Sequence, residues 1–135
     1  MTLGVLPAAF AQYALPKVVV YKSPACGCCG EWEKHMRAAG FRLETRNLSD
    51  VAAMKSRLGV PEALRSCHTA TFGDYVLEGH VPAGDVKRLL RERTKARGLA
   101  VPGMPAGAPG MEQGRAQPYA TIAFDETGSR VFERH

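Results

Sequence analysis

The chain has 135 residues, the length of a single domain with one hydrophobic core. Its hydrophobic fraction of 45% and charged fraction of 23% are ordinary for a globular protein and argue against a disordered chain. The net charge of +5 resides entirely in residues 87–97, and no apolar run reaches the ~18 residues of a membrane-spanning helix. Because this basic segment has no interleaved aromatic residues, a nucleic-acid partner is not expected.

The N-terminal segment resembles the end of an export signal. Residues 1–11 are apolar and finish in Ala9-Phe10-Ala11, the A-x-A pattern of a signal cleavage site. The basic start of such a signal is missing, so residues 1–16 are interpreted as a shortened signal remnant, or else as an apolar N-terminal arm. Residues 17–135 are then expected to form one domain.

The first half of this domain alternates strands with helices. Residues 17–22 (KVVVYK) form a β-branched run and predict a buried strand. Residues 26–39 place Cys29, Trp32 and Met36 on one helical face that faces the core. Residues 41–48 predict a second strand with one solvent-exposed face. A second helix follows, capped by Ser49 and closed by Gly59, and its apolar face is formed by Val51, Met54 and Leu58.

The second half predicts a hairpin, a helix, a long loop and a terminal hairpin. Residues 67–72 and 75–78 flank the turn Gly73-Asp74. The third helix opens at residues 82–85 and ends before Gly98. Residues 99–114 are rich in Gly, Pro and Met and predict a loop without secondary structure. Residues 119–124 and 130–133 predict the final hairpin. The fold class is therefore α/β with the order β-α-β-α-β-β-α, in which the first two strands are parallel.

The cysteines carry the chemical signal. Three of the four lie within four positions at residues 26–29 (CGCC), where a strand passes into a helix. Free N–H groups at a helix start stabilise an anion, so thiols there ionise more readily. Cys26 and Cys29 have the spacing of a redox disulfide and are the redox-active candidates, with Cys26 the more exposed. No other catalytic residue is predicted.

Cys28 favours a soft metal ion over simple disulfide exchange, which needs only two sulfurs. Zinc sites generally use two separated ligand pairs, and iron–sulfur cysteines are spaced more widely. Cu(I) tolerates crowded, bridging thiolates. A thiol–disulfide oxidoreductase acting through Cys26 and Cys29 remains the alternative.

Cys67 is the candidate fourth ligand. In a thioredoxin-like sheet, the loop that enters the third strand lies against the start of the first helix, although a lone cysteine is commonly a buried small hydrophobe. Four further residues are weaker metal or neighbouring candidates: His68, His80, Met104 and Met111. For the two histidines the alternative is a structural imidazole, and for the methionines it is packing onto the domain. His35 is expected to face solvent.

Four ordered motifs carry a resemblance to a known family. They are CGCC at residues 26–29, SCHTA at 66–70, EGHVPA at 78–83 and GLAVPGMP at 98–105. Together they resemble the CopG-type copper-resistance proteins of Gram-negative bacteria, long catalogued as a domain of unknown function, and the resemblance extends over residues 18–132.

The resemblance implies a thioredoxin-like metal-binding domain over residues 17–135 and periplasmic copper handling. It implies Cu(I) held by Cys26, Cys28, Cys29 and Cys67, as a multinuclear thiolate cluster, with thiol-linked redox activity of the copper. The expected partners are copper ions and other periplasmic copper-handling proteins.

Overall fold

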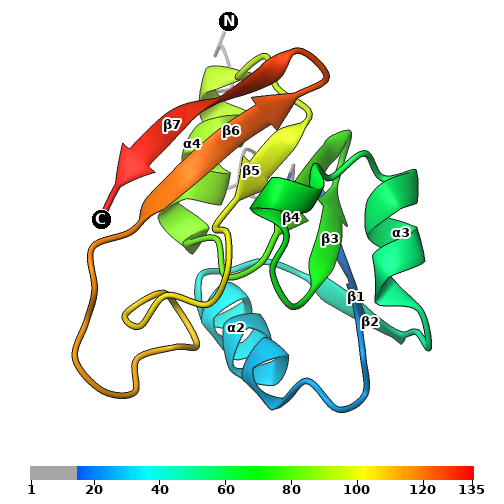
Figure 1. Ribbon diagram of the computed structural model, residues 1–135, viewed down its shortest axis with the longest axis vertical. Helices are drawn as coiled ribbons and strands as arrows, with labels where there is room; N and C mark the ends of the chain where they lie inside the picture. Colours follow the sequence, from blue (N-terminus) through cyan, green and yellow to red (C-terminus); the bar gives the residue numbers. More distant parts are fainter. Residues whose placement is uncertain (1–14) are drawn as a thin grey trace, which may run out of the picture.

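The computed structural model describes residues 15–135, so residues 1–14, most of the predicted export-signal remnant, lie outside the described part. Seven strands form one mixed sheet in the order β2-β1-β3-β4-β5-β6-β7 (Figure 1). The strands are β1 (Val18–Lys22), β2 (Leu43–Asn47), β3 (Thr69–Phe72), β4 (Tyr75–Glu78), β5 (Gly98–Ala100), β6 (Ala120–Asp125) and β7 (Gly128–Arg134). The helices are α2 (Gly27–Ala38), α3 (Val51–Arg57), α4 (Ala83–Glu92) and the short 3-10 turn η1 (Glu62–Leu64). The predicted α/β class is confirmed.

The first strand lies inside the sheet, as its β-branched sequence predicts. β1 pairs in parallel with β2 through the α2 crossover and antiparallel with β3. Val18 and Val20 are fully buried while Val19 between them is half-buried, which follows from the two-residue period of a strand. The carboxyl end of β1 therefore delivers the CGCC segment to one edge of the sheet.

Both faces of the sheet are covered. The main core contains Trp32 and Met36 of α2 and Val86 and Leu89 of α4. A smaller cluster combines the strand residues Val76, Ala100 and Phe124 with Val60, which follows α3. Leu58 and Leu64 pack against this cluster. Trp32 and Met36 are fully buried, so the inward face predicted for the first helix is confirmed.

The prediction of no secondary structure over residues 99–114 is wrong at its beginning. Residues 98–100 form β5, which pairs in parallel with β4 and antiparallel with β6. Gly98 permits this pairing, since a Cβ there would lie 1.8 Å from the carbonyl oxygen of Val76. β5 thereby joins the terminal hairpin to the rest of the sheet.

The predicted cap of the second helix is also wrong, whereas the third helix ends before Gly98 as predicted. Asp50, not Ser49, caps α3, and its side chain accepts a hydrogen bond from the Ala53 N–H at 3.0 Å. In α4 the helix ends at Glu92, because Arg93 adopts the left-handed conformation with φ 48°. The segment between Arg93 and Gly98 is consequently a loop.

Candidate metal centre

The CGCC segment stands at the start of α2. Cys26 is the N-cap residue with extended backbone, and α2 begins at Gly27. The Cys26 side chain does not cap the helix, and its sulfur is directed toward the neighbouring cysteines. Cys29 is fully buried on the inward face, whereas Cys26 and Cys28 are half-buried. The predicted difference in exposure between Cys26 and Cys29 is confirmed.

The loop carrying Cys67 lies outside the sheet. The predicted strand over residues 67–72 begins only at Thr69, which leaves Cys67 and His68 in irregular backbone. The Ser66 hydroxyl donates to the Gly103 carbonyl, and the Gly79 N–H donates to the His68 carbonyl at 3.0 Å. These bonds hold the loop against two other segments of the chain.

Gly79 makes this close approach possible. Its φ is +72°, and a Cβ built on it would lie 2.6 Å from Ser66 Cβ and 2.7 Å from the Val101 carbonyl oxygen. Any side chain at this position would push the Cys67 loop away from β4.

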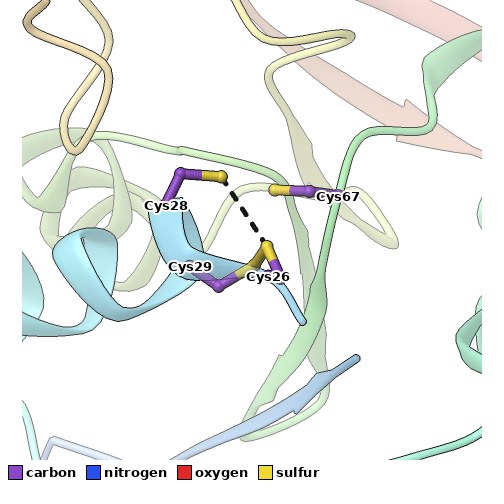
Figure 2. A group of neighbouring side chains, drawn as sticks. All are labelled: Cys26, Cys28, Cys29 and Cys67. Atoms are coloured by element: carbon purple, nitrogen blue, oxygen red, sulfur yellow. Dashed lines mark hydrogen bonds between the residues drawn. A yellow bond between two sulfur atoms is a disulfide. The ribbon is translucent and has the colours of Figure 1, made fainter. Parts of the chain in front are cut away.

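The four cysteine sulfurs converge. Each lies within 4.8 Å of the other three, although Cys67 is far from the CGCC segment in sequence. Cys26 and Cys29 form a disulfide, while Cys28 and Cys67 are free. Figure 2 shows the Cys28 and Cys67 side chains extending toward each other, with Cys28 Sγ 3.6 Å from Cys26 Sγ. The structure thus brings together the four residues predicted as ligands.

The two weaker histidine candidates flank the Cys67 sulfur. His68 Nδ1 lies 3.3 Å and His80 Nε2 lies 3.2 Å from Cys67 Sγ, and both imidazoles are fully buried. On its other side, His80 Nδ1 lies 2.5 Å from the Pro109 carbonyl oxygen. His80 thus has the backbone hydrogen bond of a structural imidazole, and the same ring also faces the Cys67 sulfur.

Burial favours the neutral forms of the Cys67 thiol and of the two neighbouring imidazoles, His68 and His80. Burial, and next the neighbouring Cys28, raise the pKa of Cys67 to about 11. Burial also lowers the pKa of His80, and it lowers the pKa of His68 well below its ordinary value, with further lowering by His80, Lys55 and Lys22. A metal ion binding here displaces the thiol proton, whereas the imidazole lone pairs are already available.

A buried ion pair behind the loop was not predicted. Glu78, fully buried, accepts from Lys55 Nζ at 2.5 Å and from the Ser66 N–H at 2.8 Å. Lys55 lies one turn after Val51 on the helix face that the sequence predicted to be apolar. The three apolar residues of this face are only half-buried, and the buried residue of α3 is Lys55. The position of Lys55 beside the apolar face of the helix was the only feature of the sequence that pointed to the pair. A lysine at such a position is ordinarily exposed, so this feature is weak.

The remaining candidates lie in different environments. Met111 is half-buried and packs against the core, whereas Met104 is 44% exposed, so only Met111 packs as a gap-filling residue. His35 does not simply face solvent as predicted. It is half-buried, and its Nε2 accepts a hydrogen bond from the Ala83 N–H at 3.0 Å, which ties α2 to the first residue of α4.

Fold and site together define a small α/β domain with a cysteine cluster able to hold a metal ion. A model of the family described as a protein of unknown function, DUF411, matches residues 64–111. Two solved structures named copper resistance protein copG, forms 2 and 1, are each 43% identical to this chain. Form 2 has a TM-score of 0.84 and the match covers 90% of this chain and 98% of that chain; form 1 has 0.83, 89% and 98%. Among curated proteins, none matches.

This chain belongs to the CopG family of copper resistance proteins. Within residues 15–135, none of the helices has the length and apolar character needed to cross a membrane.

Proposed function

We propose that the reduced protein binds Cu(I) through Cys26, Cys28, Cys29 and Cys67 and serves copper resistance. The observation that carries the proposal is the convergence of four sulfurs, all within 4.8 Å of one another, from two distant segments. Thiolates are the preferred ligands of Cu(I), and sulfurs this close can each bridge two ions. The bound state that we propose is a multinuclear copper–thiolate cluster.

Each cysteine has its own part in the proposed cluster. Cys26 and Cys28 are half-buried at the helix start and receive the ion. The fully buried Cys29 binds it from the core side. Cys67 closes the site from the opposite loop. The unpaired N–H groups of the first turn of α2, where acidic side chains are absent, favour the negative charge of the thiolates.

Anaerobic titration of the fully reduced protein with Cu(I), with copper counted per chain, tests the proposal. We expect more than one ion per chain for the native sequence and fewer for Cys28→Ser. Gly30→Ala is the matched control, because a Cβ at Gly30 meets nothing within 4 Å. A reduced protein that leaves Cu(I) with a competing chelator, or a Cys28→Ser variant with native stoichiometry, contradicts the four-thiolate site.

We further propose that thiol oxidation releases the copper. The copper-bound thiolates of Cys26 and Cys29 lose two electrons to an incoming protein disulfide while the Cys26–Cys29 bond forms. The incoming disulfide takes up two protons from solvent and becomes two thiols, and the copper leaves as Cu(I). This exchange removes two of the four ligands. The export-signal pattern of residues 1–11 supports a periplasmic setting, where disulfides persist and other copper-handling proteins would receive the ion. Cell fractionation of the full-length product tests the location.

A second candidate function is thiol–disulfide exchange on proteins, which the Cys26–Cys29 disulfide favours. Exchange needs one attacking and one resolving thiol, so it predicts that Cys28→Ser keeps full activity in a disulfide-reduction assay. If Cys28→Ser keeps that activity and also keeps native copper stoichiometry, exchange is the better description of this chain.

A further inference from the structure

The disulfide and the four-thiolate site exclude each other. With the Cys26–Cys29 bond closed, two of the four sulfurs no longer offer thiolates, and Cys28 and Cys67 are the free thiols. Cys67 nevertheless keeps two nitrogen neighbours, and its sulfur with His68 and His80 forms a second group of ligand atoms within 4.8 Å of one another. This group does not include either disulfide-bonded residue.

His80 is oriented as a metal ligand would be. A carbonyl oxygen only accepts hydrogen bonds, so His80 Nδ1 carries the proton and donates to Pro109 O at 2.5 Å. The Nε2 lone pair is then directed at Cys67 Sγ, 3.2 Å away. Metal-binding histidines commonly donate their second ring N–H to a backbone carbonyl, which sets the tautomer and the ring orientation.

The long loop holds this arrangement in place. Pro109 is buried, and the next residue, Gly110, has φ +87° and lies against His80. A Cβ at Gly110 would be 2.9 Å from both His80 Nδ1 and the backbone nitrogen of Trp32. Figure 1 shows the loop passing beside α2. The Gly- and Pro-rich loop thus supports His80.

His68 supplies the second nitrogen. Its Nδ1 lies 3.3 Å from Cys67 Sγ, and its ring packs between those of Trp32 and His80, with centroids 4.4 Å and 5.3 Å away. Its Nε2 is buried and has no hydrogen-bond partner among the described residues. Because Nδ1 is the nitrogen in contact with Cys67 Sγ, we take it as the ligand atom of His68.

The separations are close to those of a metal site. A tetrahedral ion with bonds of about 2.3 Å to sulfur and 2.0 Å to nitrogen holds the two atoms ~3.5 Å apart. The two sulfur–nitrogen distances here, 3.2 Å and 3.3 Å, need only a few tenths of an ångström of adjustment.

We propose that the protein with its Cys26–Cys29 disulfide closed has a second, mononuclear copper site, formed by Cys67 Sγ, His68 Nδ1 and His80 Nε2, that binds Cu(II). One thiolate with two imidazoles is a ligand set that proteins use for Cu(II), whereas clustered thiolates favour Cu(I). The inference rests on the proposed function, because Cys67 belongs to both sites and only one of them can be filled at a time. Closing the disulfide therefore removes the Cu(I) site and leaves Cys67 to the site that binds Cu(II).

The test uses Cys28→Ser protein with the disulfide closed, in which Cys67 is the only free thiol and cannot form a second disulfide within the chain. Titration with Cu(II) should give one ion per chain, a sulfur-to-copper charge-transfer absorption and an electron paramagnetic resonance signal coupled to two imidazole nitrogens. Co(II), which does not oxidise thiols, should bind in the same place and serves as a second probe.

Two variants in this background locate the site. Replacing Cys67 with Ser should abolish the charge-transfer band, and His80→Gln should weaken Cu(II) binding by at least 10-fold, since even outer partners of metal ligands contribute about that much. His35→Gln is the matched control, because this histidine bonds to Ala83 instead. It should bind Cu(II) as tightly as the background protein.

Three results would overturn the inference: a charge-transfer band that survives loss of Cys67, native affinity in His80→Gln, or a Cu(II) signal without imidazole coupling. The last measurement needs no histidine variant, so it decides the matter even if His80→Gln fails to fold. Binding of Cu(I) by the reduced native chain is measured separately, and its success alongside failure here would reject only the second site.

Discussion

Cys67 shows how much a single residue depends on its neighbours. Its sulfur meets the CGCC thiols on one side and two imidazole nitrogens on the other. The loop that carries it has little regular structure and is held by Glu78, Gly79 and Gly103. Changes at these supporting positions should therefore affect the metal centre without removing any ligand.

The buried Lys55–Glu78 pair gives the first prediction. Glu78→Gln keeps an acceptor for the Ser66 N–H but leaves the buried Lys55 charge without its partner, which costs about 3–5 kcal/mol of unfolding free energy. Urea unfolding of the reduced protein measures this loss. The double variant Lys55→Met with Glu78→Leu removes both charges and should recover most of the stability. If Glu78→Gln unfolds like the native protein, the pair is not buried as described.

Gly79 gives the second prediction. Gly79→Ala combines a left-handed backbone with a Cβ 2.6 Å from Ser66 Cβ, so it should lower the unfolding free energy by more than the ~1–2 kcal/mol that the backbone alone costs. It should also weaken Cu(I) binding, because the Cys67 loop must move. Gly84→Ala is the control: a Cβ there meets nothing within 4 Å, and alanine favours the helix by about 0.5–1 kcal/mol. Equal effects of the two changes would contradict the close approach at Gly79.

Among the elements, the α2–α4 contact depends on a histidine. The N-cap of α4, Pro82, has no side-chain capping bond, and the His35 imidazole accepts the N–H of Ala83 in its place. A proton on His35 Nε2 would remove this acceptor. Burial lowers the pKa of His35 from its ordinary value of 6.5, and nearby Glu112 opposes the shift.

The third prediction is a pH dependence of stability. Below pH 6.5 the unfolded chain binds a proton at His35 that the folded protein does not, so the His35 contribution is complete above that pH and is lost as the pH falls. Urea unfolding at about pH 7.5 and about pH 5.5 measures the change. His35→Gln keeps an acceptor without a titrating group and should lose less stability between the two conditions. A native protein with the smaller loss would contradict this role for His35.

At the scale of the whole molecule, β5 connects two parts of the sheet. Its three residues are buried and pair with β4 on one side and β6 on the other. Because the terminal hairpin reaches the core through this strand, we expect the described domain to unfold as one cooperative unit.

The fourth prediction follows from this connection. Leu99→Ala should lower the unfolding free energy by about 2–5 kcal/mol, since Leu99 is fully buried. Trp32 fluorescence and far-ultraviolet circular dichroism should still report coincident transitions. Val131→Ala in β7, at a side chain 43% exposed, is the control and should change stability by no more than about 0.5 kcal/mol. Separate transitions for the hairpin and the remaining sheet would show that β5 does not couple them.

Local patterns in the sequence were sufficient for most elements. The valines of β1, the inward face of α2 and the hairpin β3–β4 each follow from neighbouring residues alone, because helix and strand periods are local properties. β5 was missed since three residues are too few to show a period, and its pairing partners are distant. The cap of α3 was placed one residue early, within the usual uncertainty of helix ends.

For the site, the sequence by itself determined the chemistry. Three cysteines at a strand-to-helix junction and a fourth before the third strand predict a thiolate centre, because ligand softness is a property of the side chains. Only the tertiary structure decided which atoms meet. The contacts of Cys67 with His80, of His80 with Pro109 and of Lys55 with Glu78 join residues 13 to 29 positions apart. Such contacts depend on how loops pack against the sheet, which no local pattern encodes.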